Sequence, residues 1–103
     1  MIHVIAIITA KAGQRENMLA AARANIPAVR AEDGCVEYSL AVDTDAARPN
    51  QALFGPDTFV FIEKWRDADA LRAHAASPHM KDYGSKIKEL VASRAVHVLS
   101  PAD

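Results

Sequence analysis

The spacing of hydrophobic residues divides the first third of this chain into one strand and one helix. Residues Ile2–Ala10 (IHVIAIITA) are rich in β-branched side chains and form a run too short for a buried helix, which predicts a strand buried on both faces. From Gln14 to about Glu32, apolar residues recur at steps of three and four, which predicts an amphipathic helix. Gly34 is expected to close this helix.

The middle of the chain predicts two strands joined by a long connection. Val36–Val42 alternates well enough for a strand, and residues 43–57 form a polar segment punctuated by proline and glycine. A connection of about 15 residues is long for a compact domain and suggests a functional role. Thr58–Trp65 (TFVFIEKW) gives the strongest strand signal in the chain. One face of this strand should carry Phe59, Phe61, Glu63 and Trp65, and the other Val60, Ile62 and Lys64.

The last third predicts two helices and a strand. Asp67 is placed to cap a short helix that runs to about Ala76. Ser77 and Pro78 form a cap and first-turn pair that begins another helix. Apolar residues recur along that helix at helical spacing: Met80, Tyr83, Ile87 and Leu90. Arg94–Leu99 is the last predicted strand.

This order of elements favours one α+β domain over residues 1–103. Strand, helix, strand, strand, helix and strand suggest a ferredoxin-like βαββαβ sandwich, with a four-stranded antiparallel sheet and helices on one face. The first and third strands are apolar on both sides, yet the helices can cover only one. We therefore expect a homodimer through the open sheet face, with an apolar cavity between each sheet and its helices or loops.

Composition narrows the range of partners. Half of the residues are hydrophobic, but 21 are alanine, so a lone monomer would have a thin core. The formal net charge is −1 with no basic stripe, which argues against nucleic acid as a partner. The single cysteine, Cys35, cannot form an internal disulfide, which favours a reducing, cytoplasmic location. No Lys or Arg precedes the short apolar run at the start, so neither a signal peptide nor a membrane span is expected.

No motif for a cofactor or metal stands out. The glycines at positions 13, 34, 55 and 84 are too scattered for a dinucleotide or phosphate loop. His74 and His79 lie five residues apart across the Ser77–Pro78 break, so they lack the one-turn spacing of a helical metal site. The sequence therefore predicts no cofactor and no metal, and any reaction must draw on the chemistry of its substrate.

The run FIEKWRDADALRAHAASPHMKDY, residues 61–83, resembles the antibiotic-biosynthesis-type monooxygenase superfamily. In that superfamily a strand ending in E-x-W leads into a helix with L-x-x-H and then S-P-H-hydrophobe. The resemblance extends to Lys11 and Gly13 after the first strand and to the D-G-C turn at Asp33. The long loop and the HMKDY stretch look most like the bacterial quinol monooxygenases.

This resemblance implies a dimeric α+β barrel that oxygenates quinol-like or polyphenolic aromatics with dioxygen, without flavin, haem or metal. The superfamily also contains haem-degrading enzymes and an isomerase that acts on a phosphorylated sugar. Haem is disfavoured, because Ala6 and Gly84 stand where the haem-degrading branch has asparagine and histidine.

Three residues are candidates for catalysis. His74 is the first choice for handling a proton, because imidazole titrates near neutral pH and its helix follows the Trp65 strand; the alternative is a structural histidine. Trp65 could form the floor of an aromatic slot and anchor a substrate oxygen, or could lie in the dimer core. Tyr83 should pack its ring, with its hydroxyl able to reach a cavity.

Four further residues are candidates for binding substrate: Glu63, His79, Phe61 and Met80. Glu63 is unusual because a carboxylate between Phe61 and Trp65 needs a partner or a raised pKa; a salt bridge to an arginine is the favoured reading. His79 could equally have a capping or surface role. Cys35 is expected to be a small buried hydrophobic residue.

The predicted function is therefore a cofactor-independent monooxygenase. An isomerase acting on a small phosphorylated metabolite is the alternative among enzymes, and it would need a cationic anchor in the cavity. A small-molecule binding or stress-response module would use the same cavity without turnover.

Overall fold

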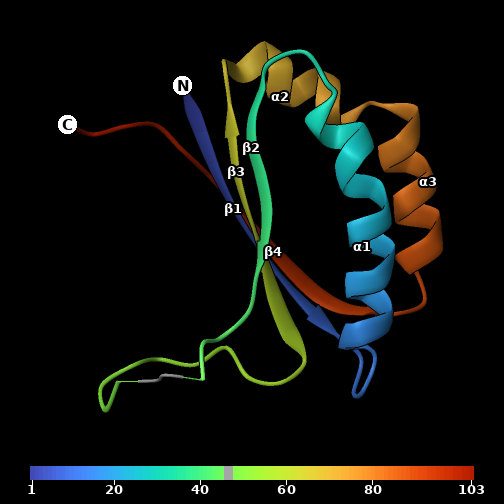
Figure 1. Cartoon of the computed structure of the whole chain (residues 1–103), viewed down its shortest axis with the longest axis vertical. Coiled ribbons are helices and arrows are strands. Elements are labelled where there is room, and N and C mark those ends of the chain that lie inside the picture. The colour runs from blue at the N-terminus through green and yellow to red at the C-terminus, as the bar shows by residue number, and fades with distance from the viewer. Residues whose placement is uncertain (46–47) are drawn as a thin grey trace.

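A computed structural model describes residues 1–45 and 48–103 and confirms the βαββαβ order, with the second helical segment divided in two (Figure 1). The elements are β1 (Ile2–Ala10), α1 (Arg15–Arg30), β2 (Cys35–Ala41), β3 (Thr58–Trp65), α2 (Ala68–Ala75), α3 (Pro78–Ile87) and β4 (Val91–Leu99). The strands pair antiparallel in the order β2-β3-β1-β4. All three helices lie on one side of the sheet, which is the ferredoxin-like arrangement (Figure 1).

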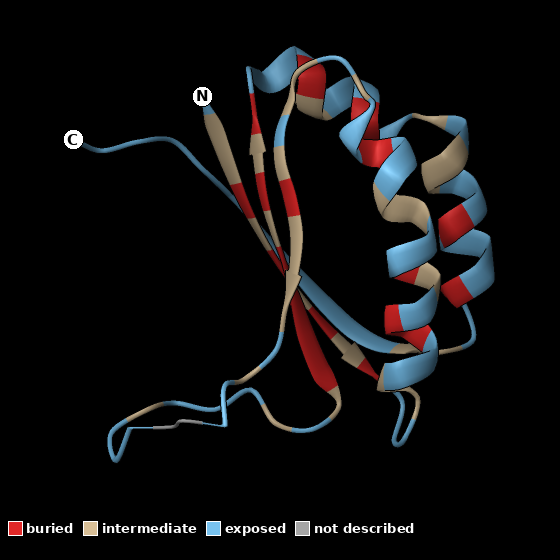
Figure 2. Ribbon diagram, in the orientation of Figure 1, coloured by how far each residue is buried: buried red, intermediate tan, exposed pale blue. Residues whose placement is uncertain are grey.

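Side chains alternate along β1 and β3 as the sequence predicts. Phe59, Phe61, Glu63 and Trp65 of β3 are buried under the helices, beside Val4, Ala6 and Ile8 of β1. These strands occupy the centre of the sheet, so the hydrophobic core lies between them and α1 (Figure 2). The exposed strand in Figure 2 is β4, which the helices leave largely uncovered even on their own side of the sheet.

Helix ends differ from prediction at two places. Helix α1 ends at Arg30, and Gly34 lies beyond it in the turn into β2, with a φ of 86°. Gly34 therefore shapes the turn and does not cap the helix. Ser77 occupies the N-cap position of α3, but its hydroxyl donates to the backbone carbonyl of His74 instead of capping the new helix. Asp67 caps α2 as predicted, because its carboxylate accepts from the backbone N–H of Ala70.

The opposite face of the sheet has no helix over it (Figure 1). The strand registers place Ile5 opposite Ile62 and Ile7 opposite Val60 on this side. These four residues form an apolar strip, which we call the open-face strip. Both sides of the central strands are apolar. The helices cover one of these apolar surfaces, and no described helix covers the other.

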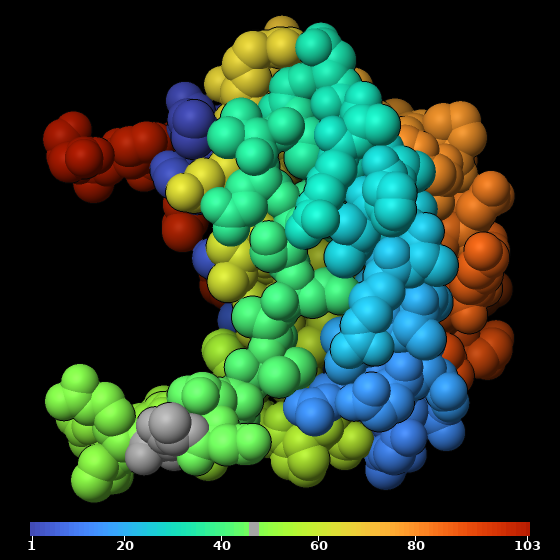
Figure 3. Space-filling view, in the orientation of Figure 1, coloured from blue at the N-terminus to red at the C-terminus, as the bar shows by residue number. Residues whose placement is uncertain are grey.

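Two segments project beyond the sheet on its open side. The C-terminal residues and the described residues of the 43–57 connection extend in that direction and bracket a concave region (Figure 3). The described part of this connection contains no helix or strand, and residues 46 and 47 lie outside the described part. Asp43 ties its two ends together by accepting from the backbone N–H groups of Phe54 and Gly55.

Within the described residues, every helix is too short or too polar to cross a bilayer.

Candidate active site

A cavity of about 330 Å³ lies between the sheet and helices α2 and α3. Its wall is largely apolar and includes Phe61 of β3 and Met80 of α3. Arg94 and Val96 of β4 complete the wall where that strand is exposed, so the cavity opens at this edge. A pocket of this size that is apolar apart from a few polar groups suits a small aromatic ligand.

Two tyrosines face this cavity, and one of them has an unsatisfied hydroxyl. Tyr83 is 7% exposed, and its hydroxyl oxygen has no hydrogen-bond partner among the described residues. Burial raises its pKa to about 12, so it remains a neutral donor at physiological pH. Burial also raises the pKa of Tyr38, which is buried on β2. A buried hydroxyl without a partner carries a desolvation penalty that a ligand oxygen would relieve.

His74 brings a titratable group to the same cavity from α2. Its imidazole is packed between the Trp65 indole, with ring centroids 4.5 Å apart, and the Tyr38 ring at 5.5 Å. Its Nδ1 lies 2.8 Å from Glu32 Oε2. A carboxylate only accepts hydrogen bonds, so Nδ1 carries the proton and Nε2 keeps its lone pair.

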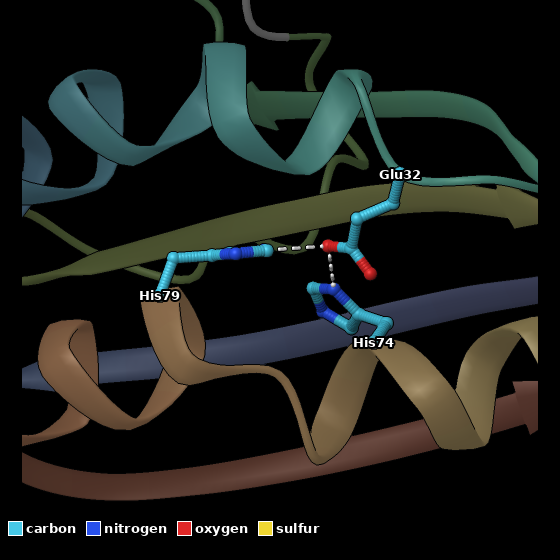
Figure 4. A group of neighbouring side chains, drawn as sticks. All are labelled: Glu32, His74 and His79. Carbon is cyan, nitrogen blue, oxygen red and sulfur yellow. Dashed lines mark hydrogen bonds and ion pairs between the residues drawn. The ribbon is translucent and has the colours of Figure 1, made fainter.

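Glu32 receives a second imidazole at the same oxygen. His79 Nε2 lies 2.8 Å from Glu32 Oε2, and Figure 4 shows both rings directed at this carboxylate. Glu32 lies in the turn between α1 and β2, while the two histidines come from α2 and α3. The Ser77 hydroxyl is 3.2 Å from His79 Nε2 and ties the α2–α3 break into the same network.

Glu63 is paired differently from the arginine salt bridge that the sequence favours. Its Oε1 accepts from Trp65 Nε1–H at 2.9 Å, and within the described residues it has no arginine partner. The indole can reach it because both side chains are on the same face of β3. Burial raises the pKa of Glu63, although the Trp65 N–H and nearby His74 oppose that shift.

The structure brings five of the seven predicted site residues to the cavity: His74, Tyr83, Glu63, Phe61 and Met80. Trp65 does not form the predicted slot floor, because it is fully buried behind Glu63 and His74 and does not line the cavity. Trp65 lies under the helices, so it is not on the open face of the sheet, where the dimer core is expected. His79 does not line the cavity either, and contacts Glu32 and a smaller hollow between α1 and α3.

Three contributors were not among the predicted site residues. Glu32 is 42 residues from His74 in the chain, and no spacing motif links them. Tyr38 faces the cavity because β2 pairs with β3 and sets it opposite Glu63. Arg94 supplies a cation at the cavity edge. The predicted strand begins at Arg94, whereas β4 begins at Val91, so the sequence did not indicate where Arg94 lies relative to the helices. Cys35 is half-buried at the start of β2, where burial raises the pKa of its thiol.

The sequence matches the family model for antibiotic biosynthesis monooxygenase over residues 1–86. A protein of Escherichia coli K12 named probable quinol monooxygenase YgiN is 36% identical over 103 residues, which cover 98% of each chain. Two solved structures are also similar. The structure of Rv0793 from Mycobacterium tuberculosis aligns with a TM-score of 0.81 at 33% identity, covering 99% of this chain and 95% of that one.

The crystal structure of PA3566 from Pseudomonas aeruginosa aligns with a TM-score of 0.83 at 28% identity, covering 99% of this chain and 94% of the other. The likeness thus spans the whole fold, including the α2–α3 segment that carries both histidines. By sequence and by fold, this chain belongs to the antibiotic biosynthesis monooxygenase family.

Proposed function

We propose that this protein is a cofactor-independent monooxygenase that inserts one oxygen atom from dioxygen into quinol-like aromatic substrates. The observation that carries the proposal is that one apolar cavity is lined by His74 and by Tyr83, whose buried hydroxyl has no hydrogen-bond partner among the described residues. Family membership supports monooxygenase chemistry, and the name of the Escherichia coli relative supports a quinol as substrate.

His74 acts as the general base. Its Nδ1–H donates to Glu32, so Nε2 is the nitrogen that accepts the phenolic proton of a bound quinol. Glu32 acts as a positioning residue, because it holds this tautomer and stabilises the imidazolium that forms. Positioned proton transfer of this kind contributes about 10²- to 10⁴-fold to a rate.

The quinol supplies all of the electrons. The quinolate passes one electron to dioxygen, and the resulting radical pair combines to form a C–O bond to a ring carbon. The imidazolium returns its proton to the peroxide. Loss of the C–H proton from the same ring carbon then breaks the O–O bond to give a carbonyl, and the departing hydroxide takes that proton as water. One quinol and one dioxygen give one hydroxyquinone and one water, so no external reductant is needed. The apolar wall of the cavity excludes water and so protects these intermediates from side reactions.

The test is oxygen consumption by metal-stripped protein supplied with reduced benzoquinols and naphthoquinols under isotopically labelled dioxygen. We expect product that carries one labelled oxygen atom, and a rate at least about 100-fold lower in His74→Ala. His97→Ala is the matched control, because His97 lies on β4 opposite Ile5, on the other face of the sheet. Equal rates for wild type and His74→Ala would mean that the oxygen uptake is autoxidation of the quinol, and would overturn the proposal.

We also propose that two copies pair through the open-face strip. Ile5, Ile7 and Ile62 are half-buried there and Val60 is buried, without any helix over them. Polar residues such as Lys64 and Glu37 lie beside the strip, where they form a salt bridge. An apolar centre with a polar rim is the usual anatomy of a protein interface. The C-terminal segment and residues 48–57 both extend to this side, where they could contact a second copy.

Arg94 favours a second candidate function. An isomerase of a small phosphorylated metabolite needs a cation in the cavity, and Arg94 lines its open edge. Titration calorimetry with inorganic phosphate tests this alternative. Phosphate binding that disappears in Arg94→Gln, together with no labelled oxygen in any quinol product, would favour the isomerase.

A further inference from the structure

Three atoms that can bind a metal ion lie close together, and one of them belongs to the proposed base, His74. His74 Nδ1, His79 Nε2 and Glu32 Oε2 all lie within 4.8 Å of one another. Both nitrogens are 2.8 Å from the carboxylate oxygen, and both rings point toward that oxygen (Figure 4). The atoms come from three separate elements, the α1–β2 turn, α2 and α3, which the surrounding core holds in place.

Two imidazoles and one carboxylate form a donor set that zinc-class ions accept, with water in the fourth position. The Ser77 hydroxyl lies 3.2 Å from His79 Nε2, so a polar oxygen is also close to the cluster. A metal ion at about 2.0 to 2.1 Å from each nitrogen would occupy space close to the present carboxylate oxygen. Rotation of the flexible Glu32 side chain would make room and keep that oxygen as a ligand.

Access and electrostatics both suit a cation at this point. The His79 side chain is 28% exposed, while Glu32 and His74 are 13% and 6% exposed, so the cluster is most open to solvent at His79. Protons now occupy the positions between the nitrogens and the carboxylate, and a divalent ion would replace them. We propose that Glu32, His74 and His79 bind a divalent zinc-class ion, and that its occupancy inhibits the enzyme.

Inhibition follows from the tautomer of His74 and rests on the proposed function. With Glu32 as partner, His74 has its proton on Nδ1 and a free lone pair on Nε2. With a metal ion on Nδ1, the neutral ring must carry its proton on Nε2. The nitrogen available to the quinol then donates a hydrogen bond and cannot accept a proton. The metal therefore removes the base without entering the cavity.

Binding is measured directly on untagged protein, by titration calorimetry with zinc chloride and by visible absorption with cobalt(II). We expect one ion per chain and an intense cobalt spectrum typical of four-coordination. His79→Ala should weaken zinc binding by at least about 100-fold, which is the upper end of what a change outside the ligand shell costs. His97→Ala, on the open face, should bind zinc as wild type does.

Zinc affinity that is the same in wild type and His79→Ala would overturn the site, whether or not the protein oxidises quinols. If zinc binds as expected, oxygen uptake by wild type should fall in proportion to occupancy and recover when EDTA is added. The same zinc concentration should not change the rate of His79→Ala relative to its own metal-free rate. Full activity of the zinc-loaded wild type would refute the inhibitory role and leave both the site and the proposed function standing.

Discussion

Glu32 and His74 are 42 residues apart in the chain, yet their side chains meet at 2.8 Å with both largely buried. This contact fixes which imidazole nitrogen carries the proton, and it does so from outside the cavity. In the proposed reaction, the carboxylate would therefore influence proton transfer without touching the substrate.

Glu32→Gln should lower the rate of quinol oxidation by about 100-fold, with a small change in KM. An amide can donate to Nδ1, which would move the histidine proton to Nε2 and remove the base. Steady-state oxygen uptake measures both parameters. Glu89→Gln, an exposed residue after α3, is the matched control. A loss that appears mainly in KM would contradict the positioning role.

Tyr83→Phe should weaken substrate binding without lowering the stability of the protein. Removal of a buried hydroxyl without a partner should leave the free energy of unfolding unchanged or raise it by about 1 kcal/mol. The same variant should raise KM for quinols by about tenfold, because a bound oxygen loses its donor. Urea unfolding and oxygen uptake provide the two measurements. Lower stability with unchanged KM would show that the hydroxyl serves the fold.

Glu63→Gln should change how stability depends on pH. Burial raises the native-state pKa of Glu63, so between the ordinary pKa and this raised value the native state holds more protons than the unfolded state. The contribution of Glu63 to stability therefore falls as pH rises through this window. Glutamine keeps the acceptor for Trp65 but does not titrate, so the variant should gain stability relative to wild type as pH rises from about 4 to 8. Urea unfolding across this range measures the difference, and a constant difference would refute the prediction.

Gly34→Ala should destabilise the protein by about 2 kcal/mol or more, since a non-glycine residue with positive φ costs about 1 to 2 kcal/mol. A Cβ at Gly34 would also lie 2.5 Å from the Cβ of Ala70. Gly84→Ala is the control: it lies in α3 with open space around it and should stabilise by about 0.5 to 1 kcal/mol. Thermal unfolding compares the two variants, and equal melting temperatures would show that the turn tolerates a side chain at Gly34.

Ile62→Lys should convert a dimer to a monomer, because it places a charge in the centre of the open-face strip. Sedimentation velocity at micromolar concentration measures the assembly. Ala28→Lys adds the same charge on the exposed surface of α1 and should leave the assembly intact. Wild-type protein that sediments as a monomer would remove the pairing proposal.

The sequence predicts the fold well because periodicity is a local signal. The bounds of β1 and β3 match their apolar runs, and the alternation of Phe61 and Ile62 correctly assigns the two sheet faces. Predicted ends are less accurate where a turn decides them. Gly34 follows the end of α1 in a turn, and β4 begins three residues before Arg94 because its pairing with β1 extends to Val91.

The site could be predicted only in part. Resemblance and helical spacing identify His74 and Tyr83 within one segment, and both line the cavity, while their roles in catalysis stay predictions. Glu32 was missed because its role depends on how the α1–β2 turn meets α2 and α3, which no local pattern encodes. Trp65 was misassigned because its indole N–H has a partner inside the chain, Glu63, two residues away on the same strand face.

The central strands β1 and β3 present one set of side chains to the cavity and the alternate set to the opposite face of the sheet. Phe61 and Glu63 line the cavity, while Ile62 and Val60 belong to the opposite surface. Substitutions that reshape the cavity for larger or smaller aromatics can thus be made without redesigning the other side. Engineering of this scaffold can treat substrate selection and self-association as separate problems.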